Sequence, residues 1–336
     1  VSEDKQKTIV SEDKQKTIVS EDKQKTIVSE DKQKTIVSED KQNIKKPSKT
    51  ISIKCENPRL KTPLRYAGGK SKAIYKLYNH LPEMDNINEI HDCFLGGGSF
   101  MIFLTKLYPN KKFIVNDLYE PLYIFWTQLK ERGVELSDKL LQIKQNHNNQ
   151  ESAKILFLEQ KQFIQDNKDS DDKDIIFKRA IAFYILNKCS FSGLVSSSFS
   201  KMASDSNFGI NGIKSLKYYS KLIQNWEIHN LDYKEFSKKF SNKEKIFLYL
   251  DPPYMIKDNL YGDHGKLHEV FKHEDFFEIC PTLKCKQLIS YNSNLMIKDA
   301  FKDYNVSDYE LTYTLRSTGT YMEDQKQRME LAIRNY

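Results

Sequence analysis

The feature that most constrains this chain is an apolar run, Ile246–Leu250, that stops at Asp251-Pro252-Pro253-Tyr254. Such a run is typical of a strand buried on both faces in a parallel sheet. The strand must end at the two prolines, because proline has no N–H to continue the hydrogen-bonded ladder. Ligands of open α/β sheets bind just beyond the carboxyl ends of the strands. The sequence therefore predicts a site with a carboxylate, a rigid carbonyl and an aromatic ring.

These three groups suit one chemical task, which is to hold a planar amino group for methylation. The exocyclic amine of a nucleobase is a poor nucleophile, because its lone pair is delocalised into the ring. Two acceptors for its hydrogens, the Asp251 carboxylate and the Pro252 carbonyl, favour a pyramidal nitrogen with a localised lone pair. Tyr254 is predicted to stack on the base, a contact worth about 1–3 kcal/mol. The alternative is an ordinary turn after a strand.

Composition sets the broad class of the protein. The chain has 336 residues, enough for one large or two modest domains, and its formal charge of +7 fits a polyanionic partner. Its five cysteines form no CxxC pair, so we expect no zinc and no other metal site. Their odd number and the lack of a signal peptide favour a reducing cytoplasm. No apolar run approaches the roughly 20 residues that span a bilayer, so no membrane partner is expected.

The first 36 residues are four copies of one nonapeptide, and a fifth copy decays after Gln42. Each copy carries two acids and two lysines, so the whole net charge lies in the rest of the chain. We expect residues 1–42 to form a mobile, mostly disordered arm. A partner-binding or length-variable tail is the alternative. Residues 43–62 are predicted to be a basic linker, and the folded domain to span 63–336.

Two glycine-containing segments predict a nucleotide-type pocket. Tyr66 and Lys70 flank a Gly-Gly pair before a predicted helix at 71–81. The Gly-Lys-Ser sequence here is not a P-loop, because Leu64 stands where the motif needs its first glycine. A predicted strand at 87–94 runs into Gly96-Gly97-Gly98 and a helix at 100–107. Met101 replaces the third glycine of the dinucleotide fingerprint, so an adenosine-containing ligand without pyrophosphate fits better.

Acids follow two further predicted strands. Asp117 comes after a strand at 112–115, about 20 residues beyond the glycines, where an acid typically binds ribose hydroxyls. Asp232 and Tyr233 come after a strand at 226–231. A strand at 287–290 and a hairpin of 309–315 with 329–336 complete the predicted sheet, with helices at 274–283 and 295–301. A loop at 255–273 contains three histidines, for which metal ligation is not favoured.

The stretch between the pocket motifs and the Asp-Pro-Pro-Tyr turn differs in character. Residues 119–190 are predicted to be helical, and 187–219 are rich in Ser, Gly, Lys and aromatic residues. That mixture suits contact with phosphates and base edges. A plain polar surface insertion is the alternative. The predicted DNA contacts are Asn187, Lys188, Phe191, Lys201, Lys214 and Lys217.

In combination, these motifs resemble the Dam-like (D12 class) adenine-specific DNA N6-methyltransferases. Residues 65–70 resemble the family's first cofactor motif, 94–99 its glycine motif and 251–254 its catalytic motif, in the same order. The resemblance covers 63–336 and leaves the repeats outside. Trp commonly stands where this chain has Tyr66, and both rings can stack.

The resemblance implies S-adenosylmethionine as cofactor and a Rossmann-like α/β methyltransferase sheet, mostly parallel with one antiparallel strand near its end. It implies an inserted, mostly helical target-recognition region at 130–225, and double-stranded DNA whose target base is flipped out. Asp232 is expected to meet the cofactor's adenine. A monomer is expected, working as an orphan methylase or beside a cognate restriction endonuclease. The residues implied to bind cofactor are Tyr66, Lys70, Phe94, Gly96, Gly98, Asp117, Asp232, Tyr233 and Asp251.

Other functions share part of this pattern. Cytosine N4-methyltransferases use the same amine chemistry but more often carry Ser in place of Asp251. RNA or protein methyltransferases more often carry Asn there. A catalytically silent DNA-binding protein of the same fold is disfavoured by the intact Asp251, Gly96, Gly98 and Asp117. Cytosine C5 methylation is excluded, because it needs a cysteine that usually follows proline, and no cysteine here does.

Overall fold

The computed structural model describes residues 61–241, 243–255, 270–311 and 328–336, which belong to one compact unit within 55–336. The predicted arm at 1–42 and nearly all of the linker at 43–62 lie outside the described residues. The same holds for most of the histidine loop and for the tip of the predicted hairpin. Within the described residues, no helix is both long and apolar enough to cross a membrane.

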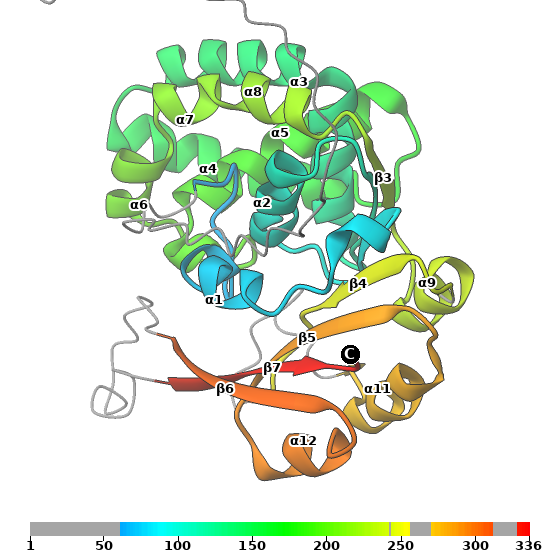
Figure 1. Ribbon diagram of the computed structural model, residues 1–336. Helices are drawn as coiled ribbons and strands as arrows, with labels where there is room; N and C mark the ends of the chain where they lie inside the picture. Colours follow the sequence, from blue (N-terminus) through cyan, green and yellow to red (C-terminus); the bar gives the residue numbers. More distant parts are fainter. Residues whose placement is uncertain (1–60, 242, 256–269, 312–327) are drawn as a thin grey trace, which may run out of the picture. The chain divides into compact units, whose positions relative to one another are not determined.

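The described residues form a seven-stranded sheet in the order β3-β2-β1-β4-β5-β7-β6 (Figure 1). Neighbouring strands are parallel except β7, which runs antiparallel to both β5 and β6. This confirms the predicted α/β sheet with one antiparallel strand near its end. The strands are β1 (Glu89–Asp92), β2 (Lys112–Asn116), β3 (Trp226–His229), β4 (Ile246–Leu250), β5 (Lys286–Asn292), β6 (Asn305–Leu311) and β7 (Arg328–Arg334).

The central strand β4 is buried on both faces, as its apolar run predicts. Alternate side chains of a strand point to opposite faces. Phe247 and Tyr249 therefore enter one hydrophobic core, whereas Ile246, Leu248 and Leu250 enter the other. Full burial of side chains of this size contributes about 1.5–3 kcal/mol each. Strand β4 therefore forms part of both cores and stabilises each.

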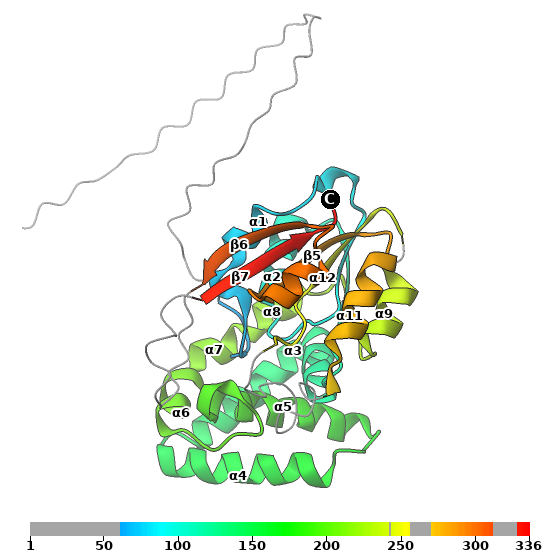
Figure 2. The ribbon, with the colours of Figure 1, turned by 90° about the horizontal axis from the view of Figure 1, so that it is seen from below.

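One core lies under the helices that precede β3 in the chain. Figure 2 shows α4 on the outer side of this group, where it packs on α5 and α6. These helices are α1 (Ile74–Tyr78), α2 (Ser99–Leu107), α3 (Glu120–Asn146), α4 (Gln150–Asp166), α5 (Lys173–Cys189), α6 (Lys201–Asn207), α7 (Ile210–Lys214) and α8 (Leu216–Leu222). The second core is covered by α9 (Tyr233–Phe240), α11 (His273–Ile279) and α12 (Leu295–Ala300).

Several predicted boundaries differ from the structure. The helix predicted at 71–81 is a 3-10 turn, Lys70–Lys72, followed by the short α1. The helix predicted at 274–283 ends at Ile279, and a 3-10 turn that contains Pro281 follows it. The polar stretch at 187–219 contains three short helices, α6 to α8, because Ile213, Leu216 and other apolar side chains within it are buried.

Helix α3 bends where it passes α8. Arg132 departs from helical geometry, with φ −125° and ψ 26°. The next residue, Gly133, lies so close to α8 that a Cβ there would be 2.4 Å from the Ser220 Cβ. Glycine is therefore required for this close approach, which anchors the inserted helices to one another.

Candidate active site

A cavity of about 250 Å³ lies at the carboxyl ends of β1, β2 and β4. The strand ends contribute Asp92, Asn116, Tyr249 and Asp251 to its wall. The structure also brings to this wall all nine residues that the sequence predicted to bind a cofactor, which are Tyr66, Lys70, Phe94, Gly96, Gly98, Asp117, Asp232, Tyr233 and Asp251.

The glycine turn after β1 forms the part of the wall beneath Tyr66. Gly96 and Gly98 adopt φ values of +51° and +65°, which side chains disfavour. A Cβ on Gly96 would be 2.8 Å from the Tyr66 ring, and one on Gly98 would be 2.8 Å from the Trp126 ring. Glycine is needed here for two reasons, the backbone conformation and the space that the two rings occupy.

Asp117 fixes two turns at the edge of the cavity. Its carboxylate accepts hydrogen bonds from the main-chain N–H of Gly96 (2.8 Å) and of Tyr119 (2.9 Å). Burial raises the pKa of this carboxyl to about 6, and the two hydrogen bonds oppose that rise. The ribose-binding role predicted for Asp117 stays a prediction, but its location on the wall suits it.

An aromatic cluster forms the opposite part of the wall. The rings of Phe94 and Tyr233 lie 5.6 Å apart, and Phe271 packs 5.3 Å from Tyr233. Asp232 lies beside them, exposed, and caps α9 by accepting a hydrogen bond from the Lys234 main-chain N–H. A flat apolar surface next to a carboxylate is suited to a ring that carries amino groups.

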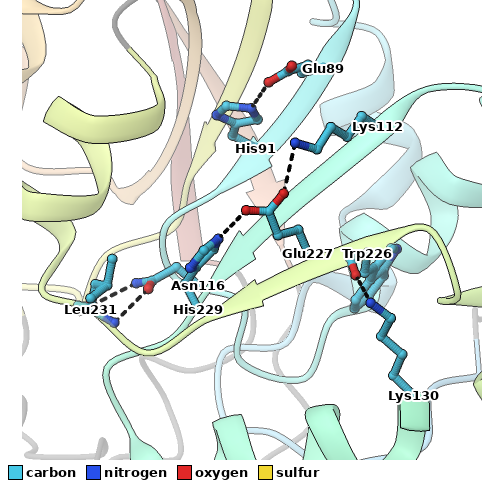
Figure 3. A network of polar contacts seen from close by, with 9 residues as sticks. All are labelled: Glu89, His91, Lys112, Asn116, Lys130, Trp226, Glu227, His229 and Leu231. Atoms are coloured by element: carbon cyan, nitrogen blue, oxygen red, sulfur yellow. Dashed lines mark hydrogen bonds and ion pairs between the residues drawn. The ribbon is translucent and has the colours of Figure 1, made fainter.

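Asn116, which sequence reasoning missed, holds Asp232 and Tyr233 in this place. Its side-chain amide donates to the carbonyls of Cys93 (3.0 Å) and Leu231 (2.9 Å) and accepts from the Leu231 N–H. Figure 3 shows the pair of bonds to Leu231 beside a polar network across β1, β2 and β3. In the sequence, the feature that could have indicated this role is an amide side chain directly before Asp117, at a predicted strand end.

In the network of Figure 3, Glu227 joins Lys112 (2.8 Å) and His229 (2.9 Å), while His91 contacts Glu89 (2.9 Å). Burial lowers the pKa of His91 to about 4. This histidine is therefore neutral at physiological pH. The Lys112–Glu227 pair links β2 to β3, whereas the His91–Glu89 contact lies within β1, and none of these four residues lines the cavity.

Lys70 and Asp251 form a close ion pair in the cavity wall. The Lys70 Nζ lies 2.7 Å from Asp251 Oδ1 and 2.8 Å from Oδ2, and it also donates to the Gly68 carbonyl (2.9 Å). The Lys70 side chain is 3% exposed and that of Asp251 19%. Burial raises the pKa of Asp251 to about 6, and Lys70 opposes the rise. The lysine therefore favours the ionised carboxylate at neutral pH.

The rest of the Asp-Pro-Pro-Tyr turn is held from behind. The Asn292 side chain accepts from the Met255 N–H (3.1 Å) and donates to the Met255 carbonyl (3.3 Å), which ties the turn to the end of β5. Tyr254 is buried, with its ring parallel to that of Tyr291 at 5.8 Å and with the Lys70 Nζ 4.8 Å from its centroid. Pro252 is buried too, and neither residue contributes to the cavity wall. Their predicted catalytic roles stay predictions.

Asp92 is a second residue that sequence reasoning missed. It ends β1, lines the cavity and is 2% exposed, and its carboxylate accepts from the Phe94 N–H (2.9 Å). Burial raises its pKa well above the ordinary value, and the nearby Asp251 and Asp117 add to that rise. The strand was predicted to continue to residue 94, which concealed an acid at its true end.

The six predicted DNA contacts fall into different environments. Lys201 and Lys214 are exposed on α6 and α7, and Phe191 is 49% exposed. Lys217 pairs with Asp138 at 2.6 Å. Lys188 is 7% exposed, with its Nζ 5.2 Å from the Tyr184 ring centroid, and burial lowers its pKa to about 8. Exposure therefore favours three of the six as direct contacts.

The structure corrects the role of Asn187. This side chain is 1% exposed, and its amide bonds to the main chain of Arg65 and to the Gly193 carbonyl. It therefore has no surface for DNA. The stretch was assigned on composition, which does not distinguish a buried amide from a surface one. Among the described residues, no cluster of three or more His, Cys, Asp or Glu side chains is placed to hold a metal ion.

The strand order, the antiparallel β7 and the cavity at the carboxyl ends define a Rossmann-like methyltransferase fold. Residues 66–315 match the D12 class N6 adenine-specific DNA methyltransferases. The chain belongs to this family and is a DNA methyltransferase.

Several curated relatives are similar over much of the chain. The type II methyltransferase M.MjaIII of Methanocaldococcus jannaschii is 28% identical over 200 residues, which cover 57% of this chain and 68% of the relative. M1.LlaDCHI of Lactococcus lactis subsp. cremoris is 24% identical, over 81% of this chain and 94% of the relative. M.CviBI of Paramecium bursaria Chlorella virus NC1A is 22% identical, over 82% and 100%.

Proposed function

We propose that the enzyme transfers a methyl group from S-adenosylmethionine to N6 of an adenine flipped out of double-stranded DNA. The observation that carries this proposal is the position of Asp251. Its carboxylate lies in the wall of the cavity that the nine predicted cofactor residues line, at the end of the central strand. A target amine that contacts Asp251 would therefore lie beside the bound cofactor.

The cavity residues fit this cofactor. When bound, S-adenosylmethionine supplies a methyl group activated by a sulfonium cation. Five aspartates line the cavity against three lysines, which suits a cationic ligand; they are Asp92, Asp117, Asp232, Asp251 and Asp275 against Lys70, Lys234 and Lys272. Phe94 and Tyr233 offer a flat apolar surface for an adenine ring, and Asp232 lies within reach of its edge.

The chain's own contribution to chemistry is to prepare the target amine. The Asp251 carboxylate is proposed to accept a hydrogen bond from that amine, which is strongest when the carboxyl is ionised, and Lys70 favours the ionised form; the proton that the methylated amine loses passes to this carboxylate or to water. The Pro252 carbonyl is proposed as the second acceptor. Because the reaction is a direct displacement, alignment of the two reactants supplies most of the rate enhancement. No nucleophilic side chain is required.

The inserted region at 130–225 is proposed to recognise the target sequence. Lys201 and Lys214 supply exposed charge for phosphates, and Phe191 supplies an exposed ring. The base inside a duplex is out of reach of Asp251, so flipping is needed, and Tyr254 is proposed to stack on it. The name that these relatives share, type II methyltransferase, supports a partner restriction endonuclease.

Methyl transfer from labelled S-adenosylmethionine to mixed-sequence DNA, followed by mass spectrometry of the nucleosides, tests this function. N6-methyladenine is the expected product, and sequencing of the modified sites then gives the specificity. N4-methylcytosine would keep the mechanism and overturn the base. Cofactor binding without any methylated DNA base would overturn the substrate.

A further inference from the structure

A buried amide joins the inserted helices to the segment that carries the first cofactor motif. Asn187 lies in the last turn of α5, and its Oδ1 accepts from the Arg65 main-chain N–H at 3.0 Å. Its Nδ2 donates to the Arg65 carbonyl at 2.7 Å and to the Gly193 carbonyl at 2.9 Å. One side chain thus satisfies main-chain groups of two segments more than 120 residues apart in the sequence.

The turn that follows α5, Phe191–Gly193, is strained and pressed against Arg65. Ser192 has φ +56°, and it is the one residue other than glycine with positive φ in the part of the chain that the structure describes. At Gly193 (φ +78°) a Cβ would lie 2.7 Å from the Arg65 Cβ, and the Arg65 guanidinium donates to the Ser190 carbonyl at 2.9 Å. Such strain persists only where the surroundings enforce it, and it concentrates at functional sites.

The contact between Arg65, Asn187 and the Phe191–Gly193 turn lies between the cavity wall and the protein surface. The residue after Arg65 is Tyr66, whose ring lines the cavity against the glycine turn. On the other side, Phe191 is half exposed at the start of the strained turn. Arg65, Asn187 and the turn therefore connect the Tyr66 ring in the cavity wall to the Phe191 ring at the surface.

We propose that Asn187 is a positioning residue that fixes the Phe191–Gly193 turn relative to the cavity wall at Tyr66. The target base of DNA bound by this turn is thereby placed within reach of Asp251. This inference rests on the proposed function. It assigns Asn187 an effect on the use of DNA without direct contact with DNA. It also predicts that cofactor binding, which depends on Tyr66 and the glycine turn, is largely independent of Asn187.

The test compares Asn187→Ala and the isosteric Asn187→Asp with Gln287→Ala. Asp keeps the acceptor for the Arg65 N–H, loses both donated bonds and places an acceptor oxygen against the Arg65 and Gly193 carbonyls. Gln287 is a matched control, because it is 0% exposed and donates to two main-chain carbonyls, those of Cys280 and Leu283, away from the cavity. Thermal unfolding, S-adenosylmethionine affinity by calorimetry, and kcat and KM for unmethylated plasmid DNA are measured for each.

We expect both Asn187 variants to lose about tenfold or more in kcat/KM for DNA, equivalent to about 1.4 kcal/mol, with cofactor affinity kept. Gln287→Ala should lose thermal stability but keep kcat/KM. Equal kinetics for Asn187→Asp and Gln287→Ala would overturn the inference, as would parallel losses of cofactor and DNA binding. If Asn187→Ala fails to fold, Asn187→Asp decides. A wild-type enzyme without methyl transfer to DNA would instead refute the proposed function.

Discussion

The cavity edge and the inserted helices are built by different rules. At the edge, function-bearing side chains sit on short turns directly after strands, and each is held by main-chain hydrogen bonds, as Asp117 and Asp92 are. In the inserted helices, polar residues of one stretch have different environments. Asn187 and Lys188 are buried, Lys217 is ion-paired, and Lys201 and Lys214 are exposed. Residue type is thus a good guide to role where the backbone dictates position, and a poor guide where helix packing does.

The largest expected effect removes the acceptor at the cavity edge. We expect Asp251→Ala to abolish detectable methyl transfer, a fall of at least about 10³-fold, because the target amine loses its carboxylate partner. The fold should remain, as judged by circular dichroism. Full activity in this variant would refute the mechanism.

A second variant tests whether the glycine turn needs its glycines. Gly96→Ala places a Cβ against the Tyr66 ring at positive φ, so we expect a loss of about 1–3 kcal/mol in stability and weaker cofactor binding. Gly209→Ala is the matched control, because its Cβ would meet nothing within 4 Å and its φ is −110°. The comparison is made by thermal unfolding and calorimetry, and similar losses in both would show that the turn is not special.

The pH profile tests the Lys70–Asp251 pair. Asp251 has a raised pKa of about 6, so its ionised form, and with it kcat/KM, is lost as pH falls through about 6. Lys70→Met removes the cation that opposes the rise, so the acid limb should move to higher pH, whereas Lys70→Arg should keep it near the wild-type position. An unmoved limb in Lys70→Met would show that another group titrates.

Smaller effects are expected at the surface lysines of the insert. Lys201→Gln and Lys214→Gln should weaken DNA binding and each reduce the slope of log K against log salt by about 0.9. Lys217→Gln should have less effect, because Asp138 already neutralises that charge. Fluorescence anisotropy across a salt series measures all three, and an equal slope change at Lys217 would mean that its ion pair opens on DNA.

The smallest effect is expected from the repeats. The family match begins at residue 66, and the cavity wall contains no residue before Tyr66 in the described part of the chain. Deletion of residues 1–42 should therefore leave turnover unchanged. A large loss would give the repeats a role beyond that of a tether.

The sheet could be predicted from the sequence because its strands carry strong local signals. The apolar run at β4, the glycines after β1 and the acid after β2 mark strand ends through backbone chemistry that no distant residue can override. Of the residues predicted to bind the cofactor, those from Phe94 onward follow such ends, whereas Tyr66 and Lys70 precede the first strand and were predicted from their glycine pair and the family resemblance. Asp92 and Asn116 were missed because the predicted strand ends differ from the observed ones by one or two residues. The side chain at a strand end lies at the cavity, so a shifted end points to the wrong residue.

The insert resisted prediction because its interior depends on contacts between segments far apart in the chain. Asn187 is buried because Arg65 and Gly193 meet it, and Lys188 because α5 is covered on all sides near its end. The contact with Gly193 is local, but the contact with Arg65, 122 residues away in the chain, leaves no signal in the composition of 187–219.

The place of β7 has a consequence for biosynthesis. Residues 328–334 lie between β5 and β6, and in the described sheet β6 pairs with β7 alone. The chain is synthesised from its N-terminus, so β6 is made before β7, its partner in the described sheet. A chain that stopped before residue 328 would contain every residue proposed for catalysis and lack the strand that attaches β6. The nascent enzyme can therefore complete its sheet only when the last strand has been made.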